Sequence, residues 1–304
     1  KNMLYRSRIK GLGFYVPENV VTNDDLSKLM DTSDEWIQER TGIQQRRHAL
    51  RGSDTTTSMG VKASLKAIEA AKINKEEIDF IVFATLSPDF YFPGCGVLVQ
   101  KELGLPTVGA LDIRNQCSGF IYALSVADQY IKTGMYKNIL VIGAETQSPA
   151  LDMSTRGRNM AVLFGDGAGA VVLEASEQEG IISTHLHASA DKHSALVLPQ
   201  PDRGVAKSGY IEMQGNETFK LAVRELSNVV EETLAANINA LKLHDVCDTV
   251  IPATDTIIKS EKGDYLDEIP DRKYLYQSQT PQSFKAKKFR EYYLSLDEAE
   301  RLEL

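Results

Sequence analysis

Short apolar runs rich in β-branched residues alternate with segments of helical periodicity through the first half of the chain. The runs predicted to be strands are residues 4–14, 79–86, 108–113 and 138–145, and the segments predicted to be helices are residues 94–103 and 117–132. Strands that are apolar at nearly every position are typical of a sheet that is buried on both faces. The alternation therefore predicts an α/β fold with a largely parallel sheet between two layers of helices.

Further elements follow from the same periodicities. Asp54 is the expected N-cap of a helix in which Val61, Leu65 and Ile68 recur at helical spacing. Residues 161–175 are expected to form two short strands that a glycine-rich turn separates. The second half of the chain is expected to contain a strand near 180–187, a polar loop near 190–210 and a helix over about 216–239.

The charge balance excludes one large class of function. The chain has 304 residues, with 34 Lys and Arg against 42 Asp and Glu, and a formal net charge of -8. A protein whose main partner is a nucleic acid needs a basic face, so that partner is not expected. The hydrophobic fraction of 42% is enough for a sizeable core.

Cysteine usage and the absence of long apolar runs indicate in which cellular compartment the protein is expected. The three cysteines, Cys95, Cys117 and Cys247, form no CxxC pair, so neither a disulfide framework nor a zinc site is expected. No apolar run reaches the length of a membrane span, and the first residues do not resemble a signal peptide. We expect a cytoplasmic protein without a membrane partner.

The segment around Cys117 has the features of a nucleophilic site. A predicted strand ends, a short turn follows, and Cys117 lies at or near the start of a predicted helix. Backbone N–H groups and the helix dipole at such a start lower the pKa of a thiol, and they can also hold an oxyanion. Gly119 would let the helix pack closely against a neighbour. The alternative is that Cys117 is a small buried hydrophobic residue, and position alone does not separate the two.

Four separated segments together resemble one enzyme family. They are DTSDEWIQERTGIQQRRH (31–48), DIRNQCSGFIYAL (112–124), FGDGAGAVVL (164–173) and GNETFKLAV (215–223). Residues 1 to about 243 resemble β-ketoacyl-acyl-carrier-protein synthase III. The resemblance implies a thiolase-like layered fold of two similar α/β halves, usually as a dimer. It also implies that Cys117 accepts an acyl group from acyl-coenzyme A and that the acyl enzyme condenses with malonyl-acyl carrier protein, losing carbon dioxide. Coenzyme A is then part of a substrate, and no permanently bound cofactor is expected.

The resemblance also implies a set of substrate-binding residues. Trp36 and Arg156 match the pair that sandwiches the adenine of coenzyme A, and an indole opposite a planar guanidinium suits that stacking. Arg40 matches a cation near the cofactor phosphates and the carrier-protein surface. Thr32 matches a nearby polar contact, and Phe219 matches a residue that lines the pantetheine tunnel.

Ordinary structural roles remain open for the same residues. Trp36 could be half-buried packing after a capping box, since Ser33 precedes it by a helical turn, and Arg40, Arg46 and Arg47 could form a solvated face. The glycines of FGDGAG (164–169) superficially suggest a phosphate loop. No Lys followed by Ser or Thr comes after them, so a tight turn that requires glycine is the better interpretation.

The resemblance breaks in the last quarter of the chain. The family's decarboxylation step uses a His in a Pro-His-Gln-Ala-Asn segment and a later Asn. Here the corresponding segment reads VIPATDT (250–256), with Ala253 where the His is expected, and neither the Asn segment nor the family's glycine-rich C-terminal loop is present. Four histidines, His185, His187, His193 and His244, are candidate replacements, although satisfied structural histidines are the more common case.

Residues 244–304 resemble a different family. HDVCDTVIPATDTIIKS (244–260) and IPDRKYLYQSQTPQSF (269–284) look like parts of cytidylyltransferases that act on ribitol phosphate or methylerythritol phosphate. Residues 1–243 contain no glycine-rich loop with Arg and Lys for the CTP phosphates. We therefore expect three segments: an N-terminal thiolase-like half at 1–174, the start of a second half at 175–243, and a segment of different resemblance at 244–304. A cytidylyltransferase and a non-catalytic module that binds acyl-coenzyme A or carrier protein are the alternative functions.

Overall fold

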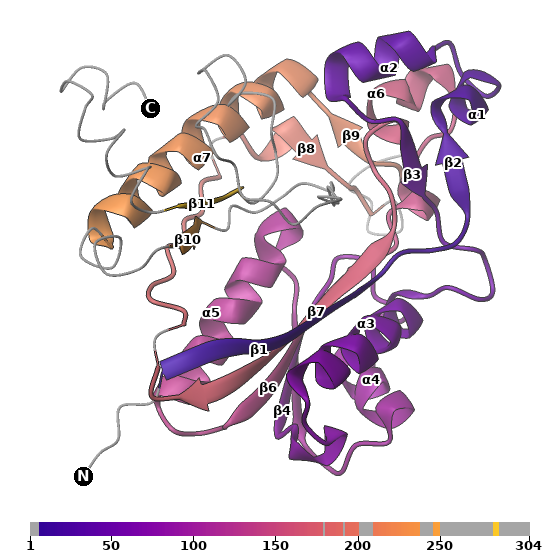
Figure 1. Ribbon diagram of the computed structural model, residues 1–304. Coiled ribbons are helices and arrows are strands. Elements are labelled where there is room, and N and C mark those ends of the chain that lie inside the picture. The colour runs from indigo at the N-terminus through magenta and orange to yellow at the C-terminus, as the bar shows by residue number, and fades with distance from the viewer. Residues whose placement is uncertain are drawn as a thin grey trace. The chain divides into compact units, whose positions relative to one another are not determined.

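The computed structural model describes residues 6–178, 180–190, 192–200 and 209–237, and the backbone of 246–249 and 282–285 (Figure 1). The described residues fall into two compact units. The first unit comprises the described parts of Lys1–Ile181 and Leu196–Met213, and the second those of Ile182–Ala195 and Gln214–Leu304.

Figure 1 labels the helices and strands in chain order. The helices are α1 Asn23–Ser27, α2 Asp34–Thr41, α3 Thr56–Ala71, α4 Cys95–Leu103, α5 Gly119–Lys132, α6 Arg158–Ala161 and α7 Gly215–Ala236. The strands are β1 Arg6–Tyr15, β2 Val20–Thr22, β3 Gln45–Arg47, β4 Phe80–Ala84, β5 Gly109–Ile113, β6 Asn138–Glu145, β7 Gly167–Ser176, β8 Leu196–Val197, β9 Glu212–Met213, β10 Val246–Thr249 and β11 Gln282–Lys285.

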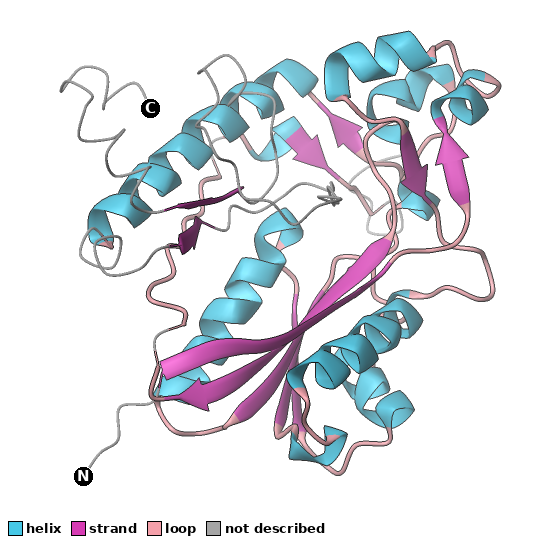
Figure 2. Ribbon diagram, viewed as in Figure 1, coloured by secondary structure: helices cyan, strands magenta, loops and turns pink. Residues whose placement is uncertain are grey.

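The first unit is built on a five-stranded sheet with the order β1-β7-β6-β4-β5. β4 pairs parallel with both β5 and β6, and β7 pairs antiparallel with both β6 and β1. Helices α3 and α4 cover one face of this sheet and α5 covers the other (Figure 2). The predicted α/β arrangement is therefore confirmed, and the carboxyl ends of β4, β5 and β6 meet at one edge of the sheet.

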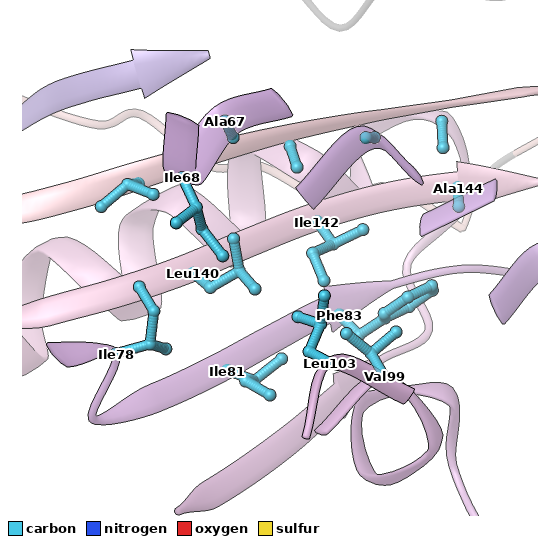
Figure 3. Close-up of a cluster of buried hydrophobic side chains, with 14 of the residues drawn as sticks. Ala67, Ile68, Ile78, Ile81, Phe83, Val99, Leu103, Leu140, Ile142 and Ala144 are labelled. Atoms are coloured by element: carbon cyan, nitrogen blue, oxygen red, sulfur yellow. The ribbon is translucent and has the colours of Figure 1, made fainter. Parts of the chain in front are cut away.

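The central strand β4 shows why the sheet is buried on both faces. All five of its residues are buried. Ile81 and Phe83 point into the cluster under α3 and α4 (Figure 3), whereas Phe80 and Val82 belong to the cluster under α5. Alternate residues of a strand face opposite sides, so a continuous apolar run supplies two cores at once.

Two expectations for the first unit need correction. The N-cap of α3 is Thr55, not Asp54, because the Thr55 hydroxyl accepts from the Ser58 N–H and the Ser58 hydroxyl accepts from the Thr55 N–H in return. Asp54 instead accepts from the backbone of Leu50 and from Lys62. The predicted strand at 108–113 exists, but β5 is only partly buried because it lies at the end of the strand order.

The glycine-rich segment 161–175 also differs from its prediction. It does not form two strands around a turn: α6 ends at Ala161 and a single strand, β7, begins at Gly167. Gly165 has no positive φ, and its role is close approach, since an added Cβ would lie 3.1 Å from the carbonyl oxygen of Arg47.

The predicted strand near 180–187 is absent, because residues 180–190 contain no strand. Ile181 donates its N–H to the carbonyl of Ser7 at 2.9 Å, which is a strand-like contact with β1. Part of the predicted loop near 190–210 forms β8, which pairs with β9. The predicted helix at 216–239 is confirmed as α7 over its described length.

Candidate active site

Cys117 lies at the sheet edge where the parallel strands end. β5 stops at Ile113, the chain turns through a short 3-10 helix, Gln116–Ser118, and α5 begins at Gly119. The Cys117 residue is exposed. An added Cβ on Gly119 would lie 3.4 Å from the Cβ of Ala84, so the first turn of α5 packs tightly against the end of β4. The predicted position of Cys117 near a helix start is confirmed, and the alternative of a buried structural cysteine is wrong.

The turn before Cys117 is held in an unusual backbone conformation. Gln116 has a φ of 42°, in the left-handed region that residues with a side chain rarely adopt. The Asn115 side-chain amide donates to the Ser118 hydroxyl at 3.0 Å, and that hydroxyl donates back to the Asn115 carbonyl. These two contacts close the turn around Cys117. Strained conformations of this kind are typical of functional sites.

Cys95 provides an internal comparison. It is fully buried at the first position of α4, and burial raises the pKa of its thiol. Asp112 accepts the backbone N–H groups of Cys95 and Gly96 at 2.6 and 2.9 Å, so the helix start at Cys95 already has an anion bound to it. A helix start therefore does not by itself make a reactive cysteine. Cys247 lies outside the residues whose side chains are described.

Glu145 connects the ends of the parallel strands. It is the last residue of β6, and its carboxylate accepts from the Leu86 N–H at 2.7 Å and the Ser87 hydroxyl at 2.6 Å. The same loop is joined to β5, because the Thr85 N–H donates to the Ile113 carbonyl at 3.1 Å. Glu145 thus fixes the loop after β4, which borders the strand end that leads to Cys117.

We expect Glu145 to make stability depend on pH. Burial raises the pKa of Glu145 above its ordinary value of 4.5, so the folded state binds this proton more tightly than the unfolded state. The resulting stability is complete below pH 4.5 and is lost as the pH rises through the folded-state pKa. Each unit of pKa elevation corresponds to about 1.4 kcal/mol. Glu145→Gln keeps a neutral side chain at all pH values and should remove this dependence.

Urea unfolding of wild type and Glu145→Gln across neutral and acidic pH measures the effect. The variant should gain stability relative to wild type as the pH rises. The exposed Glu102→Gln on α4 is the control and should follow wild type. Parallel curves for wild type and Glu145→Gln would contradict the prediction.

Asp166 explains the FGDGAG motif. Its carboxylate accepts from the backbone N–H groups of Ala49, Gln147 and Ser148 at 2.6, 2.7 and 2.8 Å. Those donors come from the segment after β3 and the segment after β6. The motif therefore places a buried carboxylate that joins two loops, in agreement with the prediction that it is not a phosphate loop.

Trp36 is the centre of a second group of predicted site residues. Ser33 caps α2, accepting from the Trp36 N–H at 3.1 Å, and the indole packs against a small core that contains Leu26, Ile37 and Ala161. The guanidinium carbon of Arg40 lies 4.4 Å from the centre of the indole ring. Trp36 is thus a packing residue whose ring also contacts a cation, and its stacking on adenine stays a prediction.

The predicted partner of Trp36 is not the residue found beside it. Arg156 is 78% exposed, and its Nε donates to Asp152 at 2.6 Å. The second guanidinium over the indole is that of Arg158, at 4.5 Å, which the sequence did not single out. The structure therefore assembles Trp36, Arg40 and Arg158, whereas the stacking role of Arg156 stays a prediction.

The remaining predicted residues are placed separately. The Thr32 hydroxyl is buried and has no hydrogen-bond partner among the described residues. Phe219 lies on α7 in the second unit with 54% of its surface exposed. Arg46 is not part of a solvated face: it is buried, burial lowers its pKa to about 10, and it donates to Asn23 and to the Val162 carbonyl.

Two candidate histidines of the second unit have structural partners. The ring nitrogens of His185 and His187 each contact one oxygen of Glu232 on α7. These two histidines hold the pKa of Glu232 below its ordinary value. This arrangement agrees with their expected role as satisfied histidines. His244 and Ala253 lie outside the described residues.

The part of the chain that the structure describes has neither a metal-binding cluster nor a membrane-spanning helix. No group of His, Cys, Asp and Glu side chains in 6–178, 180–190, 192–200 and 209–237 is arranged to hold a metal ion. Among the helices of these same ranges, none combines the length and the apolar character of a membrane span.

Comparisons with known proteins agree with the resemblance found over residues 1 to about 243. Residues 111–190 match the family described as 3-oxoacyl-[acyl-carrier-protein (ACP)] synthase III. The chain is 58% identical over 231 residues to β-ketoacyl-[acyl-carrier-protein] synthase III of Haemophilus influenzae (strain PittGG), an alignment that covers 76% of this chain and 72% of that protein. It is 50% identical over 251 residues to the protein of that name from Xanthomonas campestris pv. campestris (strain 8004), covering 81% and 75%.

A solved structure shows the same similarity at the level of the fold. The crystal structure of 3-oxoacyl-[acyl-carrier-protein] synthase III from Aquifex aeolicus VF5 superposes with a TM-score of 0.70 at 46% identity, covering 75% of this chain and 71% of that chain. The predicted thiolase-like α/β fold is therefore confirmed.

Proposed function

Because the chain belongs to the β-ketoacyl-acyl-carrier-protein synthase III family, we propose that Cys117 is its acyl-accepting nucleophile. The chain is an acyltransferase of fatty acid biosynthesis: an acyl group from acyl-coenzyme A is joined to malonyl-acyl carrier protein in the initiating condensation. The observation that carries the assignment of Cys117 is its exposed position on a strained turn at the start of α5.

The first half-reaction is a thioester exchange. The Cys117 thiolate attacks the acyl carbonyl carbon, the carbon–sulfur bond to coenzyme A breaks, and coenzyme A leaves as a thiolate that takes up a proton. The carbonyl oxygen carries negative charge in between. Backbone N–H groups at the start of α5 suit that charge, because the first N–H groups of a helix have no partner within the helix.

The coenzyme A part of the substrate is assigned to the surface around Trp36. Trp36 and Arg156 are proposed to stack on the adenine, with Arg40 near the phosphates and Thr32 as a polar contact. Phe219 is proposed to line the pantetheine tunnel. The 78% exposed side chain of Arg156 supports this proposal, because it is accessible to a ligand although its Nε pairs with Asp152.

Partners and organisation follow from the same family membership. Acyl-coenzyme A and an acyl carrier protein are the proposed partners, coenzyme A being a substrate component and not a resident cofactor. We further propose a homodimer in the cytoplasm. Residues 1–174 would form the N-terminal thiolase-like half, and 175–243 the start of the second.

Two alternative functions have distinct signatures. Residues 244–304, whose side chains lie outside the described part, resemble cytidylyltransferases, and metal-dependent release of pyrophosphate from CTP would support that activity. A non-catalytic binding module would retain coenzyme A affinity without forming an adduct.

Mass spectrometry after incubation with acetyl-coenzyme A tests the proposed function. We expect an acetyl adduct on the peptide that contains Cys117. Binding of coenzyme A without any adduct would favour the non-catalytic module and overturn the assignment.

Arg156→Ala is expected to weaken coenzyme A binding while leaving alkylation of Cys117 unchanged. A partly exposed cation–π contact contributes about 1–2 kcal/mol, which corresponds to roughly a five- to thirtyfold increase in Kd. Calorimetric titration of wild type and variant measures the change. Equal affinities would remove Arg156 from the adenine site.

A further inference from the structure

Two guanidinium groups share the single tryptophan of this chain. Arg40 approaches the indole of Trp36 from α2, with its guanidinium carbon 4.4 Å from the ring centre, and Arg158 approaches from α6 at 4.5 Å. A flat base that stacks on this indole would therefore meet a surface that cations already occupy. Which cation leaves, and which remains, depends on how each one is held.

Arg158 is held from several sides. Its Nη1 donates to the carbonyl of Asp31 at 2.6 Å, and its Nε is buried with no hydrogen-bond partner among the described residues. A buried donor without a partner is costly, so the guanidinium stays in place only because its other contacts fix it. Those contacts are the Trp36 ring and the Asp31 carbonyl.

The segment that carries Asp31 is itself fixed from the same side. The Asp31 N–H donates to the Thr155 hydroxyl at 3.0 Å, so Asp31 is joined to the segment 155–158 through both its N–H and its carbonyl. Ala161 at the end of α6 is fully buried against Leu26 and Ile37. Arg158 thus connects α6, which is anchored in this core through Ala161, to Asp31 in the segment before α2.

Arg40 is held loosely by comparison. Its side chain is 51% exposed, its Nη1 donates to the Trp36 carbonyl of its own helix at 3.2 Å, and its ion pair with Glu39 spans 3.7 Å between two exposed side chains. Exposed ion pairs of this kind are worth little. A ligand with an aromatic base and anionic phosphates can replace Arg40 on the Trp36 ring with its base. Its phosphates then offer the Arg40 guanidinium a new partner.

We propose that Arg158 is a positioning residue of the coenzyme A site, which holds the Trp36 indole in its base-stacking orientation, while Arg40 is the group that the base displaces. This inference rests on the proposed function, because it takes coenzyme A as the ligand. The outer face of the base is then available to Arg156, which would have to leave its ion pair with Asp152 to stack there. It also assigns Arg40 two positions, over the indole in the empty site and toward phosphate in the occupied one.

Trp36 fluorescence tests the proposal directly, because no other tryptophan contributes. Coenzyme A and adenosine are titrated into wild type, Arg158→Ala, Arg158→Lys, Arg40→Ala and the control Arg51→Ala, an exposed arginine. We expect Arg158→Ala to raise the Kd of both ligands about five- to tenfold and to make Trp36 more accessible to iodide quenching. Arg158→Lys retains the charge but not the planar group, and it should behave similarly.

Arg40→Ala should change the affinities for adenosine and coenzyme A in opposite directions. Adenosine, which has no phosphate, should bind about two- to threefold more tightly because its competitor is gone, whereas coenzyme A should bind more weakly. The midpoint of thermal unfolding is measured for every variant. It separates a disturbed Trp36 from a disturbed fold.

Two results would overturn the inference. They are wild-type affinity in both Arg158 variants, and weaker adenosine binding in Arg40→Ala. If wild type forms the Cys117 adduct while either of these holds, only the inference fails. If wild type neither forms the adduct nor binds coenzyme A, the proposed function fails with it.

Discussion

Cys117→Ala is expected to abolish formation of the acyl enzyme and to lower acyl transfer by about 10⁴-fold or more, since removal of a covalent nucleophile takes away the path itself. The thiol at position 117 is exposed on a turn that leads into α5, and alanine fits that turn without any new contact. The loss should therefore be chemical and not structural. Incubation with radiolabelled acetyl-coenzyme A, followed by denaturation and counting, measures it.

Cys95→Ala is the matched control. Cys95 also lies at a helix start, because it is the first residue of α4. Unlike Cys117 it is buried, and burial raises the pKa of its thiol. This variant should keep wild-type acylation, and iodoacetamide at low excess should label Cys117 before Cys95 in the wild type. A label retained in Cys117→Ala would assign the acyl group to another residue. Preferential alkylation of Cys95 or Cys247 would have the same consequence.

The sequence predicted those helices and strands whose hydrophobic pattern is complete within one segment of the chain. β4 and α5 can be recognised alone, because every residue of β4 is buried between two helix layers and buried residues recur along α5 from Gly119 to Ile131. The segment 161–175 was mispredicted because its glycines suggest a turn. Gly165 instead provides space for the backbone of Arg47, and a distant segment of the chain sets that requirement.

The candidate site shows the same division. Cys117 could be found because strand, turn and helix start are consecutive in the sequence. Glu145 and Asp166 could not, because a carboxylate after an apolar run looks like a solvated strand end. Their partners lie far along the chain, 59 residues away for Leu86 and 117 for Ala49. Burial of an acid becomes visible only when those partners are placed.

Arg158 was missed for a different reason. The resemblance to known enzymes marks Arg156, two positions earlier, and a sequence does not say which of two neighbouring arginines reaches a given ring. In the structure Arg156 lies in a 3-10 turn and pairs with Asp152, while Arg158 begins α6 and faces Trp36. Side-chain direction at a helix start decides between them, and it depends on where the helix packs.

The second large effect expected is a separation of the two half-reactions: the chain should acylate Cys117 far faster than it condenses the acyl group with malonyl-acyl carrier protein. Acyl transfer needs a thiolate and donors for one oxyanion, and the start of α5 is suited to both. Decarboxylation places charge on the malonyl thioester oxygen, which needs two aimed donors. The sequence has Ala253, which carries no side-chain donor, where the family has a His, and it has no matching Asn segment.

The size of the deficit follows from what one aimed donor contributes. Removal of a single oxyanion donor typically lowers a rate by about a hundred- to a thousandfold, so two missing donors should leave little condensation. Single-turnover assays separate the steps: the acyl enzyme is formed with radiolabelled acetyl-coenzyme A, isolated, and mixed with malonyl-acyl carrier protein. The label should stay on Cys117 or be slowly hydrolysed.

Ala253→His is the informative variant, because it restores the residue type that the family has at the matching position of the sequence. It should raise the condensation rate while leaving the acylation rate unchanged, since acylation does not use that group. Ketoacyl product from wild type at a rate comparable to acylation would contradict the prediction, and donors supplied by other residues, such as His244, would then have to act on the malonyl thioester. An Ala253→His variant that changes both steps equally would show that position 253 affects the fold and not the decarboxylation step. A donor to the malonyl thioester oxygen changes the condensation rate alone, whereas a change in the fold alters the acylation rate as well.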